Sequence, residues 1–598
     1  MKRQRTNSFK LNSCSQQLNS SSSSELDLPD DIWERVFRLL KNNDDDDHRK
    51  RYLKSLSVAS KHFLSVTNRH KFCLTILYPA LPVLPGLLQR FTKLTSLDLS
   101  YYYGDLDALL TQISSFPMLK LTSLNLSNQL ILPANGLRAF SQNITTLTSL
   151  ICSNLISLNS TDIHLIADTF PLLEELDLAY PSKIINHTHA TFSTGLEALS
   201  LALIKLRKVN LSYHGYLNGT LLSHLFKNCK FLQEVILLRC EQLTIAGVDL
   251  ALLQKPTLTS LSITCTVTTG LEHLTSHFID SLLSLKGLTS LLLTGFRISD
   301  QFLSSIAMES LPLRRLVLSY CPGYTYSGIS FLLSKSKRIQ HLDLQYTDFL
   351  NDHCVAELSL FLGDLLSLNL GNCRLLTVST FFALITNCPS LTEINMNRTN
   401  IQGTTIPNSL MDRLVNPQFK SLFLASAACL EDQNIIMFAA LFPNLQQLHL
   451  SCSYNITEEG IRPLLESCRK IRHLNLTCLS LKSLGTNFDL PDLEVLNLTN
   501  TEVDDEALYI ISNRCPALLQ LVLLRCDYIT DKGVMHVVNN CTQLREINLD
   551  GCPNVQAKVV ASMVVSRPSL RKIHVPPNFP LSDRNRKLFS RHGCLLVM

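Results

Sequence analysis

The chain has 598 residues, of which 45% are hydrophobic, 17% charged and 7% aromatic. This apolar share excludes a wholly disordered chain, and a net charge of +5 is too small over this length to indicate a nucleic-acid binder. No apolar run reaches the ~18–20 residues of a membrane span, and the start lacks the apolar core of a signal peptide. We therefore expect a cytoplasmic or nuclear protein without membrane contact, whose 19 cysteines do not form a disulfide framework.

The first 25 residues are polar and end in a run of serines, which predicts a disordered tail. The segment 26–40 (LDLPDDIWERVFRLL) then favours a helix, because a proline and two acids are typical of a first turn. Its apolar residues form two neighbouring stripes. One stripe can be buried inside a small domain, so the second needs a neighbour or a partner. Helical spacing resumes over residues 52–68, after a charged loop.

The triplet Leu-x-x-Leu-x-Leu recurs in about 19 copies, and its first residues mostly lie 26 apart, as at 313, 339, 365 and 391. Its last two anchors alternate like a short strand, and the second half of each unit, such as 531–544, has helical spacing. This pattern predicts an α/β fold: a leucine-rich-repeat solenoid over 94–575, a horseshoe with a parallel inner sheet and outer helices. We expect residues 73–93 to form a linker or capping repeat, and 576–598 a C-terminal cap.

The cysteines follow the same period. Five lie eight residues after the first anchor of their triplet: Cys240, Cys321, Cys373, Cys526 and Cys552. Five others lie three residues before the next triplet: Cys229, Cys388, Cys468, Cys515 and Cys541. Thiols at a repeat period are typical of small buried residues at turns. Because no Cys-x-x-Cys pair occurs, we expect no metal site.

Segments such as LLRCDYITDKGV (523–534) resemble the cysteine-containing leucine-rich repeats of plant-like F-box proteins, although Tyr, Ser or Thr often replaces the cysteine. Residues 26–72 resemble an F-box, with a loop lengthened by Asp44–Asp47. The residues that match the F-box pattern are Leu28, Pro29, Ile32, Val36, Phe37, Leu40, Leu56, Val58, Lys61 and Phe63.

The resemblance implies that these F-box residues, Lys61 excepted, bind a Skp-type adaptor and, through it, cullin and RING subunits. The repeats then capture a protein substrate for ubiquitination and degradation, and the chain is a non-catalytic subunit without a cofactor. Two alternatives remain open. One is a small-molecule or hormone co-receptor of the same architecture. The other is a leucine-rich-repeat scaffold outside any ligase, in which the helical module only caps the first repeat.

Outward strand positions indicate which ligands the inner face favours. The acids there outnumber the bases Lys208, Arg315 and Lys572, which argues against nucleic acid on the sheet. These acids are Asp98, Glu175, Asp177, Glu234, Asp343, Glu393, Glu546 and Asp550.

Just after the strands, tyrosines and arginines collect, and both types are enriched at binding hot spots. We predict substrate contact by Tyr101, Tyr102, Tyr180, Tyr213, Arg239, Tyr320, Tyr346, Arg398 and Arg525.

Overall fold

The computed structural model describes residues 67–68, 72–76, 83–116, 119–181, 189–255, 257–265, 272–401, 414–580, 582, 588–589 and 591–597. The predicted disordered tail and the F-box residues from Leu28 to Phe63 therefore lie outside the described residues. One compact unit comprises Cys73–Gln89 and Leu94–Met598, and the fold of this unit is a leucine-rich-repeat solenoid.

The described strands of this unit form one parallel sheet of 21 strands, in which each strand pairs with its neighbours in sequence. Equivalent residues of successive repeats are paired, as in Leu342, Leu368 and Ile394. The strands are β1 (Cys73–Thr75), β2 (Ser96–Asp98), β3 (Ser123–Asn125), β4 (Ser149–Ile151), β5 (Glu175–Asp177), β6 (Lys208–Asn210), β7 (Glu234–Leu237), β8 (Ser260–Thr264), β9 (Ser290–Thr294), β10 (Arg315–Val317), β11 (His341–Asp343), β12 (Ser367–Asn369), β13 (Glu393–Asn395), β14 (Ser421–Phe423), β15 (Gln447–His449), β16 (His473–Asn475), β17 (Val495–Asn497), β18 (Gln520–Val522), β19 (Glu546–Asn548), β20 (Lys572–His574) and β21 (Leu595–Val597).

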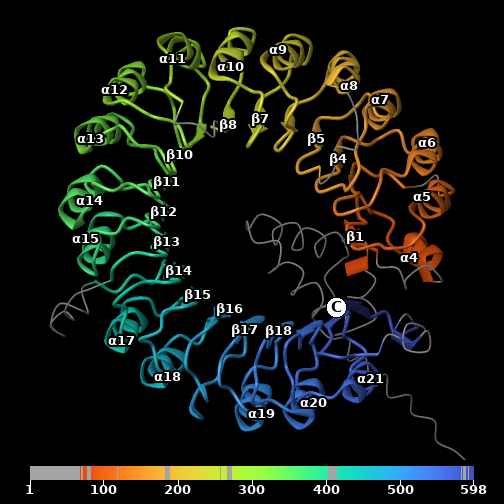
Figure 1. Ribbon diagram of the computed structural model, residues 1–598, viewed down its shortest axis with the longest axis vertical. Helices are drawn as coiled ribbons and strands as arrows, with labels where there is room; N and C mark the ends of the chain where they lie inside the picture. Colours follow the sequence, from red (N-terminus) through yellow and green to blue (C-terminus); the bar gives the residue numbers. More distant parts are fainter. Residues whose placement is uncertain are drawn as a thin grey trace, which may run out of the picture. The chain divides into compact units, whose positions relative to one another are not determined.

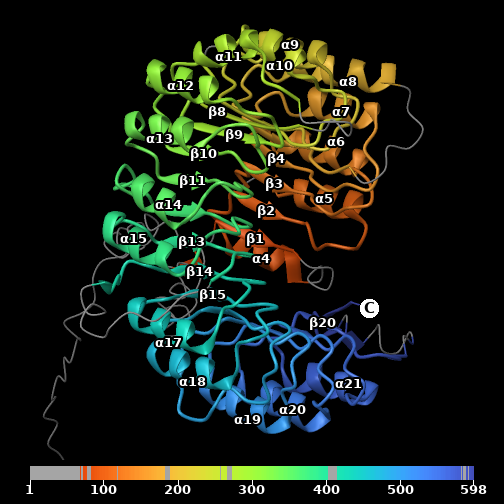
Figure 2. The same cartoon turned by 60° about the vertical axis from the view of Figure 1, so that its left-hand side comes forward.

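Helices cover the convex side of the solenoid and the strands line its concave side (Figure 1; Figure 2). The predicted α/β solenoid is therefore confirmed. The helices are α4 (Leu84–Arg90), α5 (Leu106–Ser114), α6 (Ala134–Asn143), α7 (Ser160–Thr169), α8 (His189–Ala202), α9 (Gly219–Asn228), α10 (Ile245–Leu252), α11 (Ser276–Leu283), α12 (Asp300–Glu309), α13 (Tyr326–Lys335), α14 (Asp352–Ser359), α15 (Ser379–Asn387), α17 (Asp432–Leu441), α18 (Glu458–Ser467), α19 (Asp505–Arg514), α20 (Asp531–Asn540) and α21 (Ala557–Ser566). None of the described helices is both long and apolar enough to cross a bilayer.

The core lies between the sheet and the helices. The three anchors of each triplet point into it, and Leu518, Leu521 and Leu523 are each 0% exposed. On the other side of the core, α20 buries Val534 and Val537 from one face. Burial of one such side chain contributes about 1.5–3 kcal/mol. Each repeat has a flat apolar face on both sides, so it is stable only when neighbours cover it.

A Thr-Asp-x-Gly turn at the start of one helix is hydrogen-bonded to the first residue of the helix in the preceding repeat. Thr530 is the N-cap of α20, and its backbone N–H and hydroxyl donate to Asp505 at 2.8 and 2.5 Å. Gly533 N–H donates to the same carboxylate at 3.0 Å. A Cβ at position 533 would lie 2.9 Å from the Asp505 Cα, which is too close. The motif therefore fixes the spacing between helices, and the same threonine–aspartate bonds recur at Asp300, Asp352 and Asp432.

The predicted structural thiols are confirmed, and the structure shows what they bind. In several repeats, the ninth residue from the first anchor turns a polar side chain inward, toward the backbone carbonyl of the sixth residue of the preceding repeat. Cys240, Cys526 and Cys552 donate to the carbonyls of Leu211, Leu498 and Leu523 at 3.2, 3.0 and 2.9 Å. Some of these carbonyls also accept within their own repeat, as Leu523 does from the Cys526 N–H at 3.2 Å. There the thiol adds a second hydrogen bond, one that links its turn to the preceding repeat.

Other residue types make the same bond where cysteine is replaced. Gln129 Nε2 donates to the Leu99 carbonyl at 2.7 Å, and Ser453 Oγ donates to the Leu424 carbonyl at 3.0 Å. His214 Nε2 lies 2.8 Å from the Leu178 carbonyl, so this nitrogen carries the proton. Its Nδ1 lies 2.8 Å from the Tyr216 hydroxyl, which fits a neutral ring that accepts there. The position favours a buried side chain, and cysteine is one of several polar residues there that bond the preceding repeat. Phe296 and Ala427 fill the same position without a donor.

We expect Gly533→Ala to destabilise the solenoid by about 1–3 kcal/mol, because the new methyl group would push α20 away from α19. The measurement is thermal unfolding by calorimetry. Gly363→Ala is the matched control, since nothing lies within 4 Å of a Cβ at that position. Equal melting temperatures for the two variants would contradict the role of the glycine in helix spacing.

We expect His214→Gln to remove a source of acid sensitivity. Burial lowers the pKa of His214 to about 4 from 6.5, so the unfolded chain binds a proton more readily than the fold. The neutral ring stabilises fully above pH 6.5, and the contribution falls as pH drops toward the folded pKa. Between neutral pH and about pH 5, the wild-type chain should lose about 2 kcal/mol of stability relative to the glutamine variant. Gln129 shows that glutamine fits this position. An unchanged stability difference between pH 5 and neutral pH would count against this reading.

Candidate binding surface

In the turn after most strands, one residue has a left-handed backbone conformation with positive φ. It is the eighth residue counted from the first anchor, and we call the set of these residues the exit row. Its members with positive φ, between 53° and 77°, are Asn128, Asn154, Tyr180, Tyr213, Arg239, Gly295, Tyr320, Tyr346, Asn372, Arg398, Ser426, Cys452, Cys478, Asn500, Arg525 and Gly551. Their N–H groups extend the sheet ladder, as in Tyr213 N to the Leu238 carbonyl at 2.7 Å.

Positive φ favours glycine and asparagine, and it costs other residues roughly 1 kcal/mol. Several repeats follow this preference with asparagine, as at Asn128 and Asn372. Tyrosines and arginines occupy seven other turns at that cost: Tyr180, Tyr213, Arg239, Tyr320, Tyr346, Arg398 and Arg525. The backbone does not select these side chains, so their presence points to a role outside folding.

Two groups of predicted residues come together in space. The rings of Tyr180 and Tyr213 lie 4.2 Å apart between centroids, and the Arg239 guanidinium lies 5.7 Å from the Tyr213 ring. Farther along the sheet, Tyr320 and Tyr346 stack at 3.7 Å. Burial and the neighbouring Tyr346 raise the pKa of Tyr320 to about 12, so its hydroxyl is a hydrogen-bond donor at neutral pH. Tyr180 and Tyr320 remain 45% and 46% exposed, so both stacks present aromatic surface to a partner.

The remaining predicted residues fall into two classes, exposed and buried. Arg398 and Arg525 are exposed on the exit row, in repeats that do not carry the stacked tyrosines. The positive charge of Arg398 nevertheless acts on Tyr320, where it tends to lower the pKa. Tyr101 is exposed at the turn after β2. Tyr102 is only 1% exposed, so the prediction that it contacts substrate is wrong. It occupies the inward ninth position, where the side chain packs in the core beside the turn.

The acids of the concave face are partly neutralised within the sheet. Lys208 lies between Glu175 and Glu234, at 3.5 and 3.4 Å, and Lys572 lies 2.8 Å from Glu546. Asp177, by contrast, accepts from Asn210 at 3.1 Å, and burial raises its pKa. The face therefore keeps more negative than positive charge after these pairs form.

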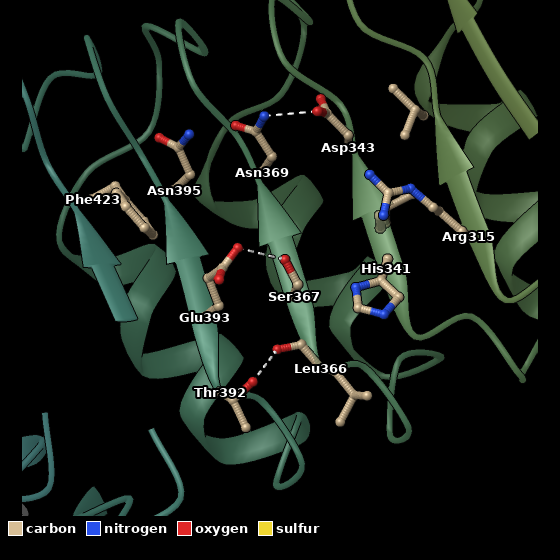
Figure 3. Close-up of a pocket in the computed structure, with 12 residues that line it drawn as sticks. Arg315, His341, Asp343, Leu366, Ser367, Asn369, Thr392, Glu393, Asn395 and Phe423 are labelled. Atoms are coloured by element: carbon tan, nitrogen blue, oxygen red, sulfur yellow. Dashed lines mark hydrogen bonds between the residues drawn. The ribbon is translucent and has the colours of Figure 1, made fainter. Parts of the chain in front are cut away.

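A hollow of about 530 Å³ lies on the concave face over β10–β14 (Figure 3). Asn369 donates to Asp343 at 2.7 Å and Ser367 donates to Glu393 at 3.0 Å, so the two acids are held in place. Phe423 closes one side of the hollow. Sequence reasoning missed Ser367, Asn369 and Phe423 as lining residues. An aromatic ring at an outward strand position is the signal that could have identified Phe423.

The turns after β10 and β11 carry Tyr320 and Tyr346, and Arg315 and His341 of these two strands line the same end of the hollow. Burial and the nearby Arg315 lower the pKa of His341, which keeps this ring neutral at physiological pH. Within the described ranges, no three His, Cys, Asp or Glu side chains are grouped in a way that could hold a metal ion. The surface is suited to polar contact and aromatic stacking.

No family model matches the sequence. The chain is similar to F-box/LRR-repeat protein 4 of Bos taurus, with 29% identity over 197 residues, and the match spans 31% of each protein. Among solved structures, the chain is similar to the TLR13–ssRNA13 complex (TM-score 0.39, 16% identity, 86% of this chain and 85% of that one). The Rad7 and Elc1 complex of yeast follows (0.36, 17%, 69% and 88%), then an LRR protein of Leptospira interrogans (0.31, 17%, 77% and 97%).

We expect Arg398→Asn to leave the thermal stability unchanged or to raise it by up to about 1 kcal/mol, because asparagine tolerates positive φ. Asn372, one repeat away on the same row, shows that asparagine is accepted there. The reverse change, Asn372→Arg, should lower stability by at least this amount, because Asn372 is also only 8% exposed. A marked loss of stability in Arg398→Asn would show that the arginine packs against the fold.

Proposed function

We propose that this chain is the substrate-recognition subunit of a Skp–cullin–F-box ubiquitin ligase. In this proposal the segment 26–72 binds a Skp-type adaptor through Leu28, Pro29, Ile32, Val36 and Phe37, with Leu40, Leu56, Val58 and Phe63 completing the surface. The solenoid captures a protein substrate, in the cytoplasm or the nucleus. The similarity to F-box/LRR-repeat protein 4 supports this architecture, although the match spans less than a third of that protein.

The observation that carries the proposal is the set of tyrosines and arginines kept at strained exit turns. Tyr180, Tyr213 and Arg239 form one contact group, and Tyr320 with Tyr346 forms a second. Both groups stand on a parallel sheet whose backbone is fixed by hydrogen bonds between all neighbouring repeats. Rigid aromatic residues lose little conformational entropy on binding, which suits them to anchor a partner.

Such a subunit acts by proximity. A separate enzyme carries the ubiquitin thioester, and the repeats hold a substrate lysine close to it, which raises the effective concentration of the two reactants. No bond-making residue of this chain is required. Its ninth-position thiols do not suit nucleophilic chemistry, because burial raises the pKa of Cys373 and Cys552 to about 12.

One observation favours a second candidate, the small-molecule co-receptor. The hollow over β10–β14 has the volume of a ligand site, and Phe423 and Asn395 offer it apolar and polar contacts. Asp343 and Glu393 line it together with Arg315, so it favours a neutral or cationic ligand over a polyphosphate. Native mass spectrometry of the purified chain tests this candidate, because a retained small molecule adds a defined mass.

The main proposal predicts that adaptor binding and substrate binding can be abolished by separate substitutions. Val36→Asp and Phe37→Asp should abolish capture of a Skp-type adaptor in a pull-down and should make bound substrates accumulate in proximity labelling. Adding Tyr213→Asn and Arg239→Asn to that background should remove most of these substrates. The asparagines fit positive φ, so this loss reflects contact and not unfolding.

The control for the second step is Tyr509→Asn, an exposed tyrosine on the convex helix α19. It should leave the labelled set unchanged. Undiminished adaptor capture by the aspartate variants would contradict the ligase role and favour the scaffold alternative. An unchanged substrate set in the asparagine variants would remove the exit row from the contact surface.

A further inference from the structure

Two cysteines stand side by side on the exit row. Cys452 and Cys478 hold the eighth position of adjacent repeats, in the same register as the paired residues His449 and Asn475. The Cys452 N–H donates to the Thr477 carbonyl at 2.8 Å, and the Cys478 N–H donates to the Thr499 carbonyl at 2.8 Å. The ladder therefore holds both backbones firmly on either side of the pair.

The spacing of this pair suits a covalent link. Adjacent strands of a sheet lie about 4.8 Å apart, and a disulfide joins Cα atoms that are roughly 4.4–6.8 Å apart. Burial and the neighbouring Cys452 side chain raise the pKa of Cys478, which agrees with the two thiols lying close together. Asn500 Nδ2 lies 3.6 Å from the Cys478 sulfur and orients it within the row.

Solvent exposure distinguishes the Cys452–Cys478 pair from the structural thiols of the ninth position. Both residues are partly exposed, whereas the ninth-position cysteines are buried and turned toward backbone carbonyls. Both also adopt positive φ, at 58° and 60°, where asparagine or glycine would fit with less strain. Neither backbone preference nor core packing explains two cysteines here.

We propose that Cys452 and Cys478 form a reversible modification site, a dithiol that low-molecular-weight disulfides convert into a disulfide between repeats. The Cys452 thiolate attacks one sulfur of the small disulfide, forms a mixed disulfide and releases one small thiol. The Cys478 thiolate then attacks the Cys452 sulfur and releases the second small thiol. Two protein thiols are oxidised and one small disulfide is reduced to two thiols, so atoms and electrons balance.

The disulfide would join the turns after β15 and β16, which lie between Arg398 and Arg525 on the exit row. The disulfide would link two adjacent turns that the ladder already holds in place, so the sheet register would not change. This site does not depend on the proposed ligase role, because the reaction needs only the two thiols and a small disulfide.

The test is disulfide mapping by mass spectrometry of the folded full chain after incubation with oxidised glutathione, at about pH 9 because the pKa of Cys478 lies above its usual range. The expected product joins Cys452 to Cys478, and excess reduced glutathione reverses it. Cys452→Ser and Cys478→Ser should each lose the link. The variant that keeps Cys452 should retain instead a mixed disulfide with glutathione.

Cys526 and Cys552 are the internal control, because they also occupy one register in adjacent repeats but are buried. Their link should form at least about tenfold more slowly, since burial disfavours the thiolate. Equal linkage of the two pairs would show that the chain had unfolded in the assay and would overturn the assignment. Linkage of Cys478 to Cys429, or only separate mixed disulfides, would also overturn it.

Discussion

The geometry of the turn that follows each strand is the constraint on which much of the solenoid depends, and this turn begins at the sixth residue of the repeat. The strand ladder satisfies the N–H of that residue, as in Leu99 N to the Asn125 carbonyl at 2.8 Å. Its carbonyl faces the core, and in several repeats it accepts from the backbone N–H of the ninth residue, as in Cys526 N to the Leu523 carbonyl at 3.2 Å. Where the ninth residue of the following repeat is Cys, Ser, Gln or His, its side chain can donate to the same carbonyl. Those side chains tie their turn to the repeat before it.

The same constraint creates the candidate binding surface. When the ninth side chain turns inward and the eighth N–H stays on the ladder, the eighth residue takes positive φ and its side chain points outward. One such side chain follows another at the spacing of the strands. Tyr180 and Tyr213, which are far apart in sequence, thereby stack at 4.2 Å. The turn thus gives a regular row of residues, most of them at least partly exposed, whose identity varies between repeats.

Neighbouring positions in one turn give cysteine two different chemistries. At the ninth position, as in Cys526, the thiol is a buried donor with a raised pKa, and it acts as a structural group. At the eighth position, as in Cys452 and Cys478, the thiol is accessible and lies beside its equivalent in the next repeat. The acids of the concave face show a similar division. Glu546 is paired with Lys572, whereas Asp177 accepts from the neutral Asn210.

The sequence by itself determined the repeat period, the strand and helix of each unit and the burial of the periodic thiols, because apolar spacing is local and recurs. It also placed tyrosines and arginines after the strands. Only the tertiary structure decided which of them face outward. Tyr101 and Tyr102 are adjacent in sequence, yet one is 47% and the other 1% exposed. The sign of φ, the stacking between repeats and the hollow near Phe423 depend on contacts between units, and no single repeat contains those contacts.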